Sequence, residues 1–106
     1  MEELDAALRH VMNAKASLED GGNPAMDIWM ARAKLEVFLV KLSLLHGFEE
    51  EPEPNLKHTG KVEINVEVLD EILNTLSLVN EAYLSENFRE AFEKGWLARE
   101  LLTKLV

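Results

Sequence analysis

The chain has 106 residues, contains no cysteine and carries a formal net charge of −9 at pH 7. A single domain of this length can bury a hydrophobic core without crosslinks, and the lack of cysteine excludes disulfides, thiolate metal ligands and a cysteine nucleophile. The acidic N-terminal residues lack the basic and apolar segments of a secretory signal, so we expect a cytoplasmic location. Glutamine is also absent, which favours a thermophilic source, although seven asparagines argue the other way.

The negative charge is concentrated in residues 49–86, which hold ten acidic and two basic side chains, whereas the rest of the chain is nearly neutral. This distribution disfavours nucleic acid and anionic membranes as partners, because both require clustered lysine and arginine. It permits a basic protein partner. The commoner role of such charge is a solvated acidic surface that keeps a protein soluble.

The first half of the chain predicts two helices joined by a short turn. Apolar residues at helical spacing predict a helix from about Glu2 to Asp20, which Gly21-Gly22 ends. Asn23 then suits an N-cap, and the proline after it suits the first helical position. The second helix should therefore run from Pro24 to about His46, and Gly47 should end it in the left-handed conformation.

The second predicted helix is apolar on two faces. One stripe consists of Ile28, Ala31, Leu35, Phe38, Leu42 and Leu45. The other stripe consists of Met26, Trp29 or Met30, Ala33, Val37, Val40 and Leu44. A helix that is apolar on two faces must be covered on two faces, so we expect it at the centre of the fold, either sandwiched within the chain or half covered by a second copy. Its five interspersed Asp, Glu, Lys and Arg residues exclude a membrane span.

The second half begins with a connector, residues 48–64, which is rich in acids and proline and which we expect to be mobile. Residues 62–68 alternate like a strand, but no other segment could pair with them. We predict instead an extended lead-in that ends at Asn65 as N-cap. A third helix should follow over Val66–Leu84 and a fourth over Phe88–Leu105, with a short turn between them.

Two tetrads in the chain resemble one another, since Trp29-Met30-Ala31-Arg32 is followed 67 positions later by Trp96-Leu97-Ala98-Arg99. Such an echo favours two related hairpins. We therefore predict an all-α fold of two antiparallel helical hairpins, which form a four-helix bundle or a short repeat-like array. The hairpins should span residues 2–47 and 65–106, to within a few residues, in a single domain of residues 1–106.

Two pairs of acids are candidate metal ligands, Glu67 with Asp70 and Glu90 with Glu93, because each pair lies one helical turn apart. Antiparallel helices would place the pairs near opposite ends of a hairpin, so a site would need ligands from a second chain. Acids in first turns are also expected from the helix dipole alone. The chain has no nucleophile elbow, phosphate-binding glycine loop or dinucleotide fingerprint, so we assign no catalytic residue and no cofactor.

Trp29 and Trp96 are candidate interaction residues, because a tryptophan with an arginine three residues on can line a pocket or anchor an interface. The commoner role of tryptophan is a core or boundary position, where its large area is buried. Exposure of either indole would therefore favour the interface.

The leading hypothesis is a non-enzymatic interaction module that forms a homodimer through the surplus apolar surface of the second helix. It would bind a protein partner through an apolar groove or through an acidic face on the third helix, Glu67, Asp70 and Glu71. The alternative is a metal-dependent nucleotide hydrolase whose carboxylates meet across a dimer. A small apolar ligand between the hairpins is a third possibility.

Overall fold

The computed structural model describes residues 1–48, 52 and 60–105. Within them the chain forms four helices, α1 (Glu2–Glu19), α2 (Ala25–His46), α3 (Val66–Leu84) and α4 (Phe88–Lys104). The predicted all-α class is confirmed, and each helix begins and ends within one residue of its predicted bounds. Most of the predicted connector, at residues 49–51 and 53–59, lies outside the described residues.

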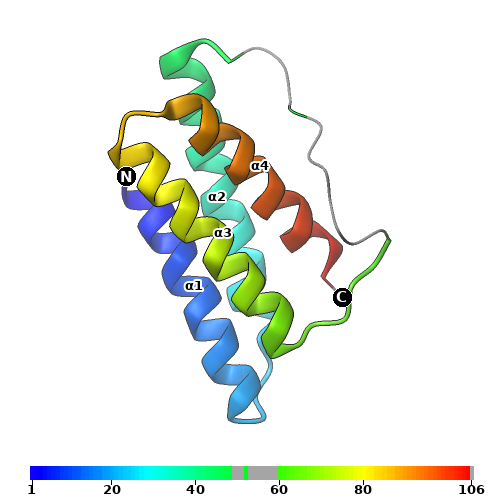
Figure 1. The fold of residues 1–106 in the computed structure, drawn as a ribbon. Coiled ribbons are helices and arrows are strands. Elements are labelled where there is room, and N and C mark those ends of the chain that lie inside the picture. The colour runs from blue at the N-terminus through cyan, green and yellow to red at the C-terminus, as the bar shows by residue number, and fades with distance from the viewer. Residues whose placement is uncertain (49–51, 53–59, 106) are drawn as a thin grey trace.

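The helices form two hairpins that dock side by side (Figure 1). Helix α1 packs against α2 and α3 against α4, while α1 also contacts α3 and α2 also contacts α4. Each of these four packed pairs is antiparallel, and α2 and α3 occupy diagonal corners of the bundle (Figure 1). The bundle form of the predicted fold is therefore the one observed.

Local signals in the sequence set the helix ends. The Asn65 side chain accepts a hydrogen bond from the Val68 backbone N–H at 2.9 Å, as expected of an N-cap. Gly47 ends α2 with φ of 72°, a left-handed conformation that glycine adopts without steric cost. The predicted N-cap of α2 was wrong by one residue, because Pro24 and not Asn23 occupies the N-cap position and no side chain caps the helix. The Asn23 side chain accepts a hydrogen bond from the Ala25 N–H at 3.0 Å from just before the cap.

The core lies along the shared axis of the bundle. Every helix contributes buried apolar residues at helical spacing. The largest side chains that are almost completely inaccessible to solvent are Leu4, Val11, Leu35, Phe38, Leu42, Leu69, Ile72, Leu76, Val79 and Leu102. The inner stripe of α2 is buried as predicted up to Leu42, but the prediction for Leu45 was wrong, because this side chain is 69% exposed. Leu45 lies in the last turn of α2, beside the end of the bundle.

Helix α2 is not sandwiched within the chain, so this alternative of the prediction was wrong, whereas cover by a second copy stays a prediction. Among the described helices, α2 occupies one corner of the bundle and contacts α1 and α4. A helix in a four-helix bundle buries one stripe against its neighbours. The second stripe of α2 is consequently left uncovered by the other described helices.

Helices α2 and α4 approach each other closely at Gly95, which is buried in α4. A Cβ atom at this position would lie 2.7 Å from Cδ2 of Leu39 in α2. The missing side chain therefore allows this contact between the hairpins.

The lead-in to α3 makes a single contact of β type. The Val62 N–H donates to the Lys104 carbonyl at 2.8 Å, and Val62 forms one isolated parallel bridge with Leu105. The lead-in is therefore held at the C-terminal end of α4. None of the described helices is both long enough and apolar enough to cross a membrane.

Candidate functional site

The outward stripe of α2 forms an exposed apolar surface, here called the α2 face. It consists of Met26, Trp29, Met30, Ala33, Val37, Val40 and Leu44. Met26 is 70% exposed, Trp29 55%, Val40 57% and Leu44 80%. Met30 and Ala33 are partly exposed between them. From Met30 to Leu44 the apolar positions alternate in steps of three and four, which is the spacing of a coiled-coil seam.

The α2 face is large for a lone chain. Its side chains expose on the order of 600 Å², which is at the upper end of the largest apolar patch on a typical monomer. Apart from Leu45, the other large apolar side chains with similar exposure among the described residues are Met12 on α1 and Leu78 and Leu84 on α3. Among the described residues, the α2 face is therefore the extended apolar surface that a partner could cover.

Ion pairs border the α2 face on both sides. On the α1 side, Lys41 donates a hydrogen bond to Glu3, which lowers the pKa of that carboxyl. On the α4 side, Arg99 Nε donates to Glu36 Oε1 at 3.2 Å. Burial opposes the charge of Arg99, but its hydrogen bonds to Glu100 and Glu36 outweigh this and raise its pKa. An apolar centre with a charged rim is the usual anatomy of a protein interface.

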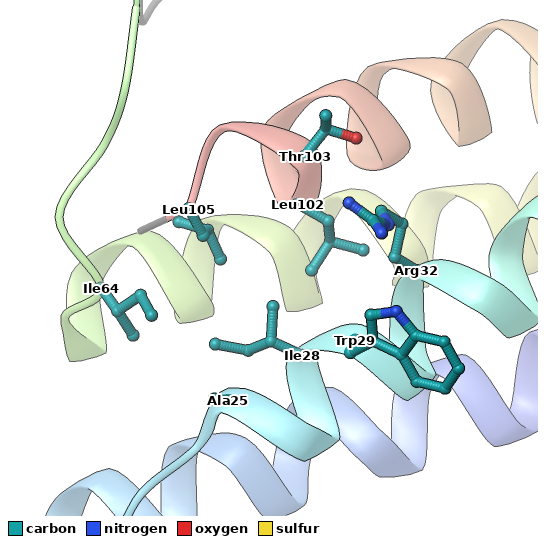
Figure 2. Close-up of a pocket in the computed structure, with 8 residues that line it drawn as sticks. All are labelled: Ala25, Ile28, Trp29, Arg32, Ile64, Leu102, Thr103 and Leu105. Atoms are coloured by element: carbon teal, nitrogen blue, oxygen red, sulfur yellow. The ribbon is translucent and has the colours of Figure 1, made fainter.

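A pocket of about 200 Å³ opens at the N-terminal end of the α2 face, between the two hairpins. Figure 2 shows the side chains that line it, from α2, from the lead-in to α3 and from the end of α4. They are Ala25, Ile28, Trp29, Arg32, Ile64, Leu102, Thr103 and Leu105. Trp29 therefore belongs both to the α2 face and to the pocket.

The two tryptophans occupy the same place in the two similar tetrads, but they have different surroundings. Trp29 is more than half exposed. Trp96 packs against the core, with the Phe92 ring 6.3 Å away and the Arg99 guanidinium 5.1 Å above its own ring. Its indole Nε1 is buried and has no hydrogen-bond partner among the described residues. Of the two tryptophans, Trp29 is therefore the exposed one.

The acidic residues predicted on α3 are partly neutralised. Asp70 forms an ion pair with Lys15 of α1 at 2.7 Å, and this hydrogen bond raises the pKa of Lys15. Glu71 is half-buried, and only Glu67 of the three is exposed. The predicted acidic face therefore carries less unpaired charge than the sequence implies.

The two acid pairs lie at opposite ends of the α3–α4 hairpin, because each is near the start of its helix and the helices are antiparallel (Figure 1). Glu90 accepts a hydrogen bond from the Asn87 side chain at 2.9 Å, and Glu93 accepts one from Arg89 at 3.0 Å. Within residues 1–48, 52 and 60–105, no three His, Asp or Glu side chains gather as metal ligands would.

The sequence allowed an apolar ligand between the hairpins but did not indicate which residues would line a pocket there. The pocket joins Arg32 of α2 to Ile64 of the lead-in and to Leu102 and Leu105 at the end of α4. These residues meet because the lead-in to α3 crosses the C-terminal end of α4, and no local pattern signals that contact.

Comparisons of the chain with protein-family models, with curated proteins and with solved structures found no match. The class of protein is therefore defined by the fold and the surface: a four-helix bundle of two hairpins with an exposed apolar helix face.

Proposed function

We propose that this chain is a helical interaction module that self-associates through the α2 face. The observation that carries the proposal is the continuous apolar seam on α2, which the described part of the chain leaves exposed to water. Burial of apolar area is the main driving force of protein association. The sequence contains no motif that would connect this surface to catalysis, so association with a partner is the function that best explains its exposure.

A second copy is the partner that the seam fits best. A two-fold dimer requires a surface that is complementary to itself, and a seam with coiled-coil spacing can pack against an identical seam. Two copies of the α2 face would bury about 1,200 Å², the lower limit for a stable specific interface. We therefore expect a dimer of micromolar affinity rather than an obligate one.

The test is the absolute mass in solution, measured by light scattering over a range of protein concentrations. Val40→Glu places a charge in the middle of the seam at a position that is 57% exposed in the single chain, so the fold should be retained. Leu78→Glu is the matched control, because Leu78 is 46% exposed on α3, diagonally opposite α2.

We expect the natural chain to approach the dimer mass at high concentration, Val40→Glu to stay a monomer and Leu78→Glu to behave like the natural chain. A natural chain that stays monomeric at the highest concentration would contradict the proposal. So would loss of the dimer in Leu78→Glu alone.

The acidic face and the metal-dependent hydrolase receive less support. Asp70 already pairs with Lys15, and Glu90 and Glu93 pair with residues of their own helix or its cap. A basic protein partner remains a prediction, checked by loss of salt-sensitive binding when Glu67, Asp70 and Glu71 are changed to lysine. The hydrolase predicts a thermal shift with Mg²⁺ or Mn²⁺ and nucleotide. A cytoplasmic location and a thermophilic source remain predictions from composition.

A further inference from the structure

The pocket between the hairpins has the size and walls of a site for one small apolar group. Its volume of about 200 Å³ is smaller than the pockets of drug-sized ligands, about 300–1,000 Å³. It exceeds the roughly 150 Å³ apolar cavity that accommodates benzene. Ile28, Ile64 and Leu105 lie around one end of the pocket and Leu102 above it (Figure 2).

Arg32 supplies the single charge of the pocket lining, since none of the eight residues is acidic. Its Nε lies 3.9 Å from Glu36 Oε1, too far for a hydrogen bond. The same carboxylate oxygen accepts the hydrogen bond of Arg99 at 3.2 Å. Arg32 therefore interacts with Glu36 more weakly than Arg99 does. Its planar guanidinium still has N–H donors that could bind the carboxylate of a ligand.

Trp29 gives the pocket an aromatic wall beside this charge. In Figure 2 its indole lies next to the Arg32 side chain at the end of the pocket away from Ile64 and Leu105. A ligand ring in the pocket could pack against the indole while its anionic group meets the guanidinium. The arrangement thus combines one apolar volume, one aromatic surface and one cation.

We propose that this pocket binds a small aromatic carboxylate, with the ring among the apolar side chains and the carboxylate on Arg32. The pocket is built within one chain, so this proposal does not depend on self-association. The net charge of −9 opposes an anion at long range, but salt screens charges more than about 10 Å apart, and the pocket lining itself is positive.

The probes are phenylacetate and its neutral analogue phenylacetamide, each titrated into the isotopically labelled full chain and followed by amide chemical shifts. Arg32→Met removes the charge and keeps the length of the side chain. Arg89→Met is the matched control, because Arg89 is an exposed arginine of α4 whose ion pair with Glu93 lies away from the pocket. Ala25→Leu adds carbon atoms to the lining at an exposed position and should fill the pocket.

We expect saturable shifts from phenylacetate confined to residues around the pocket. Arg32→Met should weaken phenylacetate binding at least tenfold and change phenylacetamide binding less than twofold, while Ala25→Leu should abolish both. Arg89→Met should bind as the natural chain does.

Shifts that rise linearly and spread over all the basic residues would overturn the proposal, as would equal weakening by Arg32→Met and Arg89→Met. Phenylacetamide binding as tightly as phenylacetate would overturn the assignment of the carboxylate to Arg32. Light scattering of the same samples reports the dimer separately, so failure of one proposal is distinguishable from failure of the other.

Discussion

Replacing Gly95 by alanine tests how closely α2 and α4 pack. The added methyl group would lie 2.7 Å from Leu39 Cδ2 and 3.9 Å from Phe38 Cε2, whereas carbon atoms normally approach to about 3.5–4.0 Å. In an open helix this exchange would stabilise the fold by about 1 kcal/mol. Overpacking in a closed core costs about 1–3 kcal/mol. We expect a net destabilisation of about 1 kcal/mol.

A second substitution isolates this contact. Leu39 is 3% exposed, so Leu39→Ala alone should destabilise the fold by about 2–4 kcal/mol. In that background Gly95→Ala no longer meets Leu39, and it should stabilise the fold by about 1 kcal/mol through helix propensity. The two substitutions should therefore couple by about 2 kcal/mol.

The assay is urea unfolding of the four proteins, followed by far-ultraviolet circular dichroism at one low protein concentration so that self-association contributes equally little to each. A stabilising effect of Gly95→Ala in the natural chain would refute the expected overpacking against the Leu39 side chain. Additive effects of the two substitutions would refute it as well, because independent sites do not couple.

Three further predictions concern a cap, an ion pair and the α2 face. Asn65→Ala should cost about 1 kcal/mol of folding free energy in urea unfolding and Asn65→Asp much less, because only alanine lacks the capping oxygen; equal losses would contradict the cap. Lys41→Met should remove the hydrogen bond that lowers the pKa of Glu3 below its ordinary value of 4.5. The hydrogen bond stabilises the fold above that pH, and this stabilisation is lost as the pH falls and Glu3 becomes protonated. The midpoint temperatures of thermal unfolding of the variant and the natural chain should therefore converge in acid, and a difference that persists there argues against this linkage. Val37→Cys, near the middle of α2, should form a disulfide-linked dimer on mild oxidation, visible on a non-reducing gel, whereas Leu78→Cys should not; linkage of both alike would point to random collision.

The helices could be predicted from the sequence because their signals are local. Asn65 lies where an N-cap is needed, Gly47 lies where the chain must turn left-handed, and both perform these roles in the structure. The apolar spacing of α2 also identified its buried stripe up to Leu42. It failed at Leu45, since periodicity says which residues share a face and not where the neighbouring helices end.

The arrangement of the helices could not be predicted in the same way. The two stripes of α2 predicted cover on two faces, but whether that cover comes from its own chain or from a second copy depends on which helices become its neighbours. The near-identical patterns around Trp29 and Trp96 likewise predicted similar positions. Phe92 and Arg99 lie against Trp96, whereas Trp29 faces outward, so long-range packing distinguishes them.

The diagonal placement of α2 and α3 has a consequence for how this chain folds. Each hairpin closes through a short turn, so most of its contacts join residues that are close in sequence, and such local units form quickly. We expect docking of α1 on α3 and of α2 on α4 to follow hairpin formation and to join the two halves of the bundle. Residues 1–48 and 60–106, supplied as two separate polypeptides, are therefore expected to find each other and rebuild the bundle, which would make the chain a natural two-piece complementation system.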